Sequence, residues 1–205
     1  MKKTLGLFLT GHPIDEYEPE LREMLPNRII DLRPGKDKAT VYGMIVAMRV
    51  MKNKRGENFA FLTLDDKSGR IEISVWAEKF NAYRELLVKD ALLVIQGEVS
   101  EDDFTGGLKL VAESIQSIYE ARCSQLKELK ISLVNSEIND ECMAYLQATL
   151  SQYKGGFCPV VVEYQMPKAV GQFTLGEQWR IHPRDECIHQ IREHFGKNTV
   201  ELTYS

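Results

Sequence analysis

Between residues 40 and 118, apolar and polar residues alternate in five short runs, and a run with helical spacing separates the third from the fourth. Alternation with a period of two is typical of strands that bury one face, whereas apolar residues three and four apart are typical of an amphipathic helix. We therefore predict strands at residues 40–50, 59–64, 70–76, 92–99 and 108–118, and a helix at 78–88. This order of elements limits the possible folds more than any other feature of the chain.

Five short strands with a helix between the third and the fourth follow the order of an OB-fold, a small Greek-key barrel. The first strand of such a barrel bends to join both sheets, and strands two and three face the ligand. A glycine inside a strand often marks a bulge or a sharp bend, and Gly43 lies near the start of the first predicted strand. We predict an OB-fold domain at residues 39–118 with its bulge at Gly43.

The sequence on either side of this segment has a different pattern. Four prolines surround one short amphipathic run at 17–25, so residues 1–38 are predicted to be a connecting segment with a short helix. Residues 119–205 carry strands and helices in the order β-α-β-β-α-β, which is typical of a split βαβ or ferredoxin-like unit. The predicted fold class is α+β with two domains: a five-stranded OB-fold Greek-key β-barrel followed by a small β-α-β-β-α-β domain.

Periodicity and capping residues place the elements of this last domain. Strands are predicted at 130–134, 159–164, 170–175, 178–181 and 199–204, and helices at 121–127, 138–150 and 184–195. Ser136 is expected to cap the middle helix, because serine accepts hydrogen bonds from free N–H groups of the first turn. Gly155 and Gly156 are expected to end that helix, and Gly196 to end the last one.

Composition narrows the class of protein. Apolar residues make up 43% and charged residues 27% of the chain, which is typical of a folded globular protein. The net charge of −4 argues against a protein that coats nucleic acid through bulk positive charge. No apolar run is long enough to cross a bilayer, and the N-terminal run is too short for a secretory signal. With four irregularly spaced cysteines, expected to be reduced, this predicts a cytoplasmic protein that contacts no membrane.

No motif for catalysis or for a cofactor stands out. The sequence has no glycine-rich phosphate loop, no HExxH, no GxSxG and no paired-cysteine metal motif. Cys187, His189 and His194 share a predicted helix, but the histidines are five residues apart, whereas metal ligands on a helix are three or four apart. The carboxylates at 65–66 and 101–103 fall in predicted turns, where aspartate needs no metal. We therefore predict no catalytic residue, no metal and no cofactor.

A binding constellation remains in the predicted barrel. Positive charge is concentrated around the loop between the first two strands, which holds four cations and no acid: Arg49, Lys52, Lys54 and Arg55. This loop leads directly into Phe59 and Phe61. Proteins that bind single strands use cations to follow the phosphates and aromatic rings to stack the bases. The sequence therefore predicts a nucleic-acid site here, with Arg70, Phe104 and Lys109 as further candidate contacts.

The direction of Phe59 and Phe61 separates two interpretations. In one register, the aliphatic residues at 60, 62 and 64 fill the barrel and the two phenylalanines face the ligand. In the opposite register the phenylalanines form the core, and the basic loop is an ordinary solvated hairpin. Phe104 is harder to bury, but its acidic neighbours at 101–103 would repel phosphate.

Three stretches of the chain resemble one family. They are LGLFLTGHPIDEY near the start, KNKRGENFAFLTLDDKSGRIEISVW in the barrel and LLVIQGEVSEDDFTGGLKLVA later in it. With the closing NTVELTYS, they resemble the C-terminal region of the bacterial replicative DNA polymerase III alpha subunits over nearly the whole chain. The stretch LTLDDKSGRIEI alone is also similar to OB-folds of aminoacyl-tRNA synthetases, so LGLFLTGHP followed by the barrel is the more specific signal.

The resemblance implies a non-catalytic piece of a larger subunit. The catalytic aspartates of the family belong to its palm, which has no counterpart in this sequence. The resemblance implies that the barrel binds single-stranded template DNA, which fits Lys52, Lys54, Arg55 and Phe61. The clamp-binding motif of the family lies upstream of LGLFLTGHP, so contact with the sliding clamp would rest at most on residues 200–204.

The resemblance also implies that the last domain binds the tau subunit of the clamp loader. Candidates for this contact are large or basic side chains on the last helix and its flanks: Trp179, Arg180, His182, Arg192 and Phe195. Two other interpretations stay open. The barrel could be an RNA-binding module of a tRNA synthetase-like enzyme, which would prefer structured RNA, or a structural spacer, which would bind no nucleic acid at physiological salt.

Overall fold

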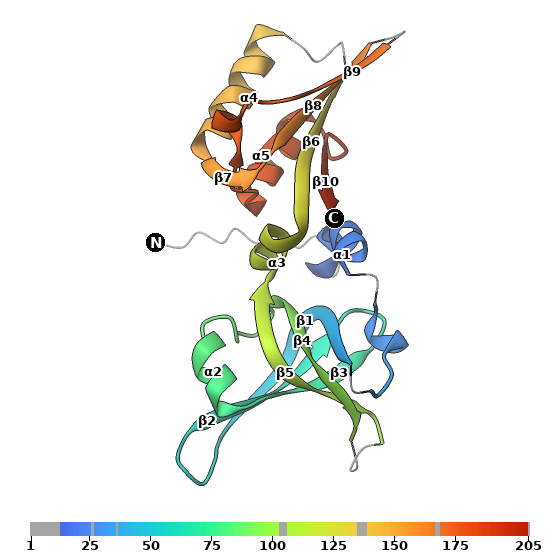
Figure 1. Cartoon of the computed structure of the whole chain (residues 1–205), viewed down its shortest axis with the longest axis vertical. Helices are drawn as coiled ribbons and strands as arrows, with labels where there is room; N and C mark the ends of the chain where they lie inside the picture. The colour runs from blue at the N-terminus through green and yellow to red at the C-terminus, as the bar shows by residue number, and fades with distance from the viewer. Residues whose placement is uncertain are drawn as a thin grey trace. The chain divides into compact units, whose positions relative to one another are not determined.

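In the computed structural model, five strands in the first part of the chain close into a barrel (Figure 1). They are β1 (Lys38–Lys52), β2 (Asn58–Asp65), β3 (Arg70–Val75), β4 (Leu92–Glu101) and β5 (Leu108–Ser117), with helix α2 (Ala77–Tyr83) between β3 and β4. The order around the barrel is β1-β2-β3-β5-β4, with β3 and β5 parallel and the other neighbours antiparallel. The predicted OB-fold is confirmed.

The structure describes residues 13–25, 27–35, 37–102, 106–134, 139–166 and 169–204. The chain divides into two compact units, residues 1–118 and residues 119–205, each with its own sheet and hydrophobic core. Within the described residues, no helix is long and apolar enough to cross a membrane.

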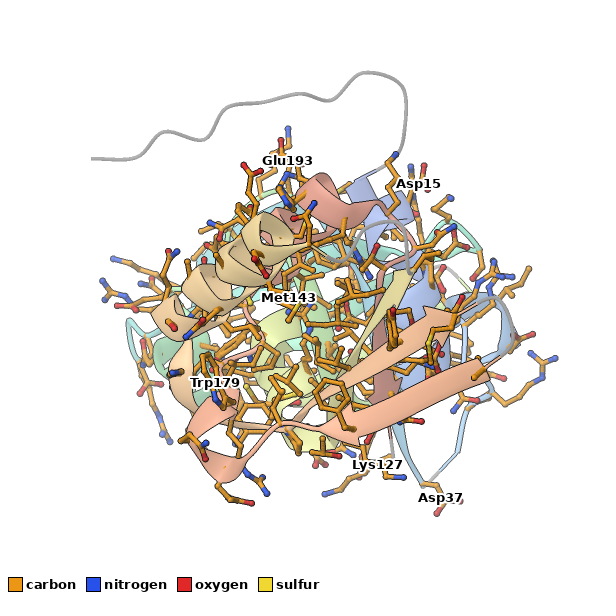
Figure 2. The ribbon with its side chains drawn as sticks, turned by 90° about the horizontal axis from the view of Figure 1, so that it is seen from above. Asp15, Asp37, Lys127, Met143, Trp179 and Glu193 are labelled. Carbon is orange, nitrogen blue, oxygen red and sulfur yellow. The ribbon has the colours of Figure 1, made fainter. Side chains whose placement is uncertain are left out.

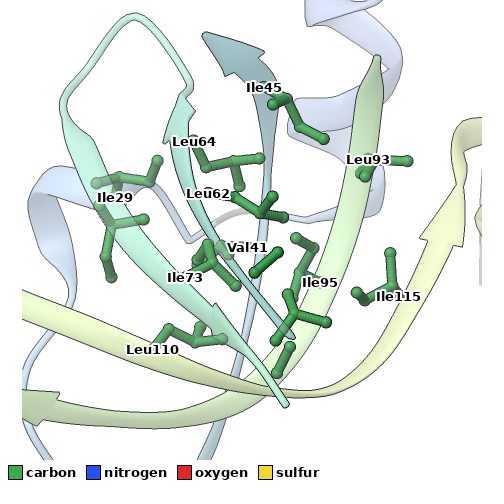
Figure 3. Close-up of a cluster of buried hydrophobic side chains, with 14 of the residues drawn as sticks. Ile29, Val41, Ile45, Leu62, Leu64, Ile73, Leu93, Ile95, Leu110 and Ile115 are labelled. Atoms are coloured by element: carbon green, nitrogen blue, oxygen red, sulfur yellow. The ribbon is translucent and has the colours of Figure 1, made fainter. Parts of the chain in front are cut away.

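Alternation along the strands fills the barrel. Leu62 and Leu64 on β2 and Ile73 on β3 are at most 1% exposed and point into the barrel (Figure 3). Aliphatic side chains from the other strands complete this core. Closure gives every strand two hydrogen-bonded neighbours and so removes the open edges on which sheets aggregate.

β1 is long enough to pair with two strands. Its first half pairs with β4 and its second half with β2. The register shifts between Ile45 and Ala47, so the prediction of a bulge at Gly43 is wrong. Gly43 instead permits a close approach: a Cβ atom there would lie 2.8 Å from the Leu64 side chain and 2.9 Å from the Asp65 carbonyl oxygen.

α2 is shorter than predicted, because it ends at Tyr83 instead of residue 88. The chain then turns, with a left-handed backbone at Asp90 (φ 65°). The Asp90 N–H donates to the Ile45 carbonyl, and the Ile45 N–H donates to the Ala91 carbonyl. These bonds to β1 direct the chain into β4. Leu87 is still buried in the barrel core, so the apolar stripe that predicted a longer helix packs without helical geometry.

The turn between β2 and β3 anchors the segment that precedes the barrel. This segment forms η1 (Pro13–Glu16), α1 (Glu18–Met24) and η2 (Ile29–Asp31), of which α1 is the predicted short helix. The buried Asp66 carboxylate accepts hydrogen bonds from the Ile29 N–H at 2.9 Å and from the N–H groups of Ser68 and Gly69. The Ile29 side chain is buried in the barrel core, so the segment is held by both polar and apolar contacts.

The rest of the chain forms a four-stranded sheet with helices. Its elements are α3 (Ile118–Gln125), β6 (Leu126–Val134), α4 (Asp140–Gln152), β7 (Lys154–Cys158), β8 (Val160–Met166), β9 (Ala169–Thr174), η4 (Glu177–Trp179), α5 (Asp185–Phe195) and β10 (Val200–Tyr204). The sheet order is β10-β6-β8-β9, and β6 and β8 are parallel neighbours. The strands of this sheet and their helices follow the predicted β-α-β-β-α-β order, with β7 as an additional strand outside the sheet. The split βαβ or ferredoxin-like interpretation is wrong, because β6 and β8 pair directly with each other.

Alternate residues of β6, at 129, 131 and 133, are buried together with side chains of α4 and α5. Both helices therefore cover the same face of the sheet. Arg122 links α3 to the start of α5: its guanidinium is 1% exposed, donates to the Pro183 carbonyl at 2.7 Å and pairs with Asp185 at 2.7 Å.

Three local predictions in this unit are wrong. The N-cap of α4 is Asn139, whose side chain accepts a backbone N–H of the first turn, and Ser136 lies outside the described residues. Gly155 and Gly156 belong to β7, where a Cβ atom at Gly156 would lie 2.0 Å from the backbone of Ile181. The predicted short strand that ends at Ile181 is instead η4, followed by isolated bridges from that residue.

Replacement of Asp66 by alanine removes the acceptor of three backbone N–H groups, those of Ser68 and Gly69 in the β2–β3 turn and that of Ile29 in η2. We expect Asp66→Ala to lower the unfolding free energy by roughly 2 to 3 kcal/mol, and Asp66→Asn, which keeps one acceptor oxygen, to lower it less. Urea unfolding measures this, with Asp37→Ala, an exposed carboxylate, as the matched control. Equal stability of Asp66→Ala and wild type would show that the turn does not anchor the preceding segment.

Because two thiols are buried, the unfolding free energy should depend on pH in the alkaline range. Burial raises the pKa of Cys158 and of Cys187 to about 12, whereas an unfolded thiol ionises near pH 8.5. Folded chains therefore hold more protons above pH 9, and the unfolding free energy should fall as pH rises, by up to ~1.4 kcal/mol per pH unit for each thiol. Urea denaturation at several pH values above 8 measures this dependence. The unfolding free energy should fall more steeply with pH for wild type than for Cys158→Ala/Cys187→Ala. If the unfolding free energies of the two proteins fell equally with pH, the raised pKa values of the two thiols would be contradicted.

Candidate nucleic-acid interface

The outer face of β2 carries the two phenylalanines. Ala60 and Leu62 are buried in the barrel, whereas Phe59 and Phe61 are half-buried on the opposite side of the strand. Of the two registers that the sequence allowed, the structure has the one in which the phenylalanines face outward, and the register that makes them core is wrong. The same period of two that fills the barrel therefore supplies its aromatic surface.

Trp76 joins these rings, although it was not among the predicted site residues. It follows β3 directly and is 50% exposed. Its ring centroid lies 5.7 Å from that of Phe59 and 6.4 Å from that of Phe61, and the two phenylalanines are 5.6 Å apart, edge to face. The alternation of the third strand does place Trp76 on the same side as Ser74, the cross-strand neighbour of Phe61. This was the sequence signal that could have identified it.

The end of β1 borders the aromatic cluster formed by Phe59, Phe61 and Trp76. Arg49 is the cross-strand partner of Phe61, and its guanidinium carbon lies 5.4 Å from the centre of that ring. Met51, which is 43% exposed, is the partner of Phe59. One cation and one flexible apolar side chain therefore lie beside the rings.

The loop between β1 and β2 is held by one side chain. The Asn53 side-chain oxygen accepts from the N–H groups of Arg55 and Glu57, and its amide donates to the Glu57 carboxylate at 2.8 Å. Gly56 completes the turn with φ 81°, a backbone region that favours glycine. The loop is therefore an ordered, hydrogen-bonded turn, and its basic side chains extend from a fixed backbone.

Lys52, Lys54 and Arg55 are exposed, and no acidic side chain in the described part of the chain forms an ion pair with them. With Arg49, they form a basic hairpin at one end of the outer face. Their charge is available to a ligand, because none of these cations is held in an ion pair with a described acid; the one acid of the turn, Glu57, is bonded to the Asn53 amide instead.

The remaining predicted contacts lie elsewhere. Arg70 pairs with Asp65 at 2.7 Å, at the opposite end of β2 from Phe59 and roughly 20 Å along the strand. Lys109 on β5 is the partner of Glu72 and pairs with Asp102 at 3.7 Å. The structure therefore does not bring these two cations to the aromatic cluster. Phe104 lies outside the described residues.

Side chains predicted for a partner contact are engaged within the second unit. Trp179, which Figure 2 labels, packs partly on the core. The Lys154 ammonium lies 3.3 Å from the centre of its ring. Arg180 donates one hydrogen bond to the Phe157 carbonyl and another to the Glu177 carboxylate. The bond to Glu177 lowers the pKa of that carboxyl group.

The other three predicted partner residues also have contacts inside the unit. His182 lies 3.3 Å from the Tyr119 hydroxyl, Arg192 donates to the Val200 carbonyl, and Phe195 packs partly on the core. These contacts give each residue a structural role, and the sequence could not show this because it does not reveal which elements meet.

The histidines of the last helix do not converge on Cys187. Cys187 is buried, His189 faces Glu193 at 4.0 Å, and the His194 ring stacks on Tyr145 at 3.8 Å. Across the described residues, no three histidine, cysteine or carboxylate side chains group as metal ligands would.

Two family models match the chain. Residues 39–118 match the OB-fold nucleic acid binding domain, and residues 145–196 match the C-terminal domain of DNA polymerase III subunit alpha. The barrel and most of the second unit therefore each have a counterpart among known domains.

Similar proteins agree with these models. DNA polymerase III subunit alpha of Pseudomonas fluorescens is 46% identical over 99% of this chain, and that of Escherichia coli strain K12 is 39% identical over 99%. The chain spans 17% and 18% of the lengths of these relatives. Among solved structures, a domain of replication protein A from Methanococcus maripaludis is 22% identical with a TM-score of 0.37, covering 45% of this chain and 93% of that domain.

The identity to these relatives runs through both units, and the two family models fall in the order in which the units follow one another. The chain therefore belongs to the DNA polymerase III subunit alpha family and corresponds to its C-terminal region, with an OB-fold nucleic acid binding domain.

Proposed function

We propose that the barrel binds single-stranded DNA along the outer face of β1, β2 and the end of β3. The observation that carries this proposal is the position of the basic hairpin, whose cations form no ion pair with a described acid, directly beside the aromatic cluster. Cations attract the phosphates and aromatic rings stack unpaired bases, and the two functions must lie side by side to act on one strand.

The overall charge of −4 does not oppose this proposal. Screening confines the field of an exposed charge to about 8 Å at physiological ionic strength, so a bound strand experiences the hairpin and not the whole molecule. The acidic side chains that pair with Arg70 and Lys109 lie toward the other end of the face. We therefore expect the strand to be held at the hairpin end.

We further propose that the second unit docks on the tau subunit of the clamp loader, and that this region is non-catalytic and works in the bacterial cytoplasm. The resemblance to DNA polymerase III alpha subunits is the support for these statements, and a chain that covers less than a fifth of those relatives also fits a non-catalytic region. An RNA-binding role for the barrel remains the alternative, and competition between single-stranded DNA and structured RNA distinguishes it.

The edge strand β9 supports a docking role. Leu175 N–H donates to the Val160 carbonyl, and bonded and non-bonded pairs alternate in an antiparallel ladder. The N–H and C=O groups of Val170, Gln172 and Thr174 therefore point away from β8, toward the side on which no described strand pairs. Edge strands usually carry charges that prevent pairing, whereas β9 carries none and exposes Val170 and Phe173 by 65% and 53%.

Reversal of the hairpin charges should weaken DNA binding. We expect Lys54→Glu/Arg55→Glu to lower the affinity for a labelled deoxythymidine oligomer at least about tenfold at low salt. The slope of log K against log salt should become shallower by about 1.4, because two phosphate contacts are lost. Fluorescence anisotropy at several salt concentrations measures both quantities.

Arg84→Glu/Lys89→Glu is the matched control, since it makes the same charge change. Lys89 adjoins the turn that hydrogen-bonds Ile45, at least about 20 Å along β1 from Lys52. The control should bind with nearly wild-type affinity. Equal losses in both variants would mean that general charge, and not the hairpin, governs binding.

Substitution on the β9 edge should weaken docking. We expect the full chain to bind the C-terminal part of tau in isothermal titration calorimetry, and Phe173→Asp to lower that affinity at least about tenfold by placing a charge on the pairing edge. Met143→Asp on α4, where the side chain is 40% exposed, is the control. No heat with wild type would refute docking on tau, and unchanged affinity of Phe173→Asp would exclude the β9 edge.

A further inference from the structure

Trp76 is the most exposed ring of the aromatic cluster. Half of its surface is accessible, whereas Phe59 and Phe61 are each more than half covered. Its carbonyl accepts from the Phe80 N–H at 2.8 Å, the bond that starts α2, so its backbone is fixed between a strand and a helix. A large aromatic side chain held rigidly at the surface provides contact area at little cost in conformational entropy.

Phe61 is less available to a base than its position on β2 suggests. The Arg49 guanidinium lies over its ring at 5.4 Å, and the edge of Phe59 packs beside it. Phe59 in turn is tilted by 34° against the indole ring of Trp76. The two phenylalanines therefore contact the indole and the arginine, while the indole keeps its exposed surface.

The charges around Trp76 fit a polyanion. Arg49 lies next to the cluster, and the rest of the basic hairpin follows along the same strand. Three acids lie near this face: Glu78 lies 3.5 Å from Lys79, Glu57 accepts a hydrogen bond from the neutral Asn53 amide, and Glu72 is exposed on the outer side of β3, opposite Thr63. Glu72 lies four residues, about 13 Å, along β3 from Trp76, on the side away from the hairpin, so a strand held at the hairpin end passes the indole without crossing Glu72.

We propose that Trp76 stacks directly on one unpaired nucleobase, and that Phe59 and Phe61 are positioning residues that hold the indole ring. This inference rests on the proposed binding of single-stranded DNA, and it assigns to Trp76 the main contact between the barrel and a base. Stacking on an indole uses no hydrogen bonds to the base edge, so the site accepts any base. The ligand class is an unpaired nucleobase within a strand whose phosphates contact Arg49 and the hairpin.

The two tryptophans of the chain, Trp76 and Trp179, lie in different units, so Trp179→Phe leaves Trp76 as the single indole reporter. In this background, a deoxythymidine oligomer of about 15 nucleotides should quench the emission, saturating at the Kd that anisotropy gives. Trp76→Ala should weaken binding by about fivefold to a hundredfold, and Trp76→Phe by less. The salt slope should not change, because no phosphate contact is lost.

Three outcomes would overturn the inference. If Trp76→Ala binds as tightly as wild type while wild type binds well, the base contact lies elsewhere and the proposed function stands without it. If Trp76→Ala makes the salt slope shallower as the hairpin variant does, the tryptophan acts by positioning the cations. If wild type binds no oligomer at low salt, the proposed function fails, and the inference fails with it.

Discussion

The alternation of side chains along β2 determines both the stability of the barrel and the composition of its outer face. Because successive residues point to opposite sides of a strand, a shift of one residue would exchange Leu62 for Phe61 in the core. Leu62 is 1% exposed and Phe61 is half-buried, so a single register serves the core and the surface together. Closure of the sheet fixes this register, since β2 is paired on one side with β1 and on the other with β3.

The hairpin shows why local geometry matters more than net charge. In a chain with a net charge of −4, a local cluster of cations can attract an anion if the fold holds the acidic side chains away from that cluster. Asp65 and Asp102 pair with Arg70 and Lys109, while Asn53 holds the hairpin backbone. Of the cations predicted to bind nucleic acid, the four on the hairpin beside the aromatic cluster therefore form no ion pair with a described acid, whereas Arg70 and Lys109 do.

Much of the first unit could be predicted from sequence, because strand order and burial follow from alternation. The position of the bulge could not be predicted. Gly43 is needed because the backbone lies close to Leu64 and Asp65, and only the folded barrel shows this contact. The role of Trp76 was missed for a similar reason: its ring meets Phe59 across two strands. In the second unit the element order was predictable, but order does not determine pairing, and β6 and β8 proved to be direct neighbours.

The central claim is that single-stranded DNA binds across the hairpin and the aromatic cluster. Amide and indole NMR shifts of the labelled chain, recorded while a deoxythymidine oligomer is added, test it most directly. The account predicts that the largest shifts fall on residues 49–61 and on Trp76, including its indole N–H. Shifts confined to the loop between β4 and β5 or to the second unit, or no shifts at all at low salt, would contradict it.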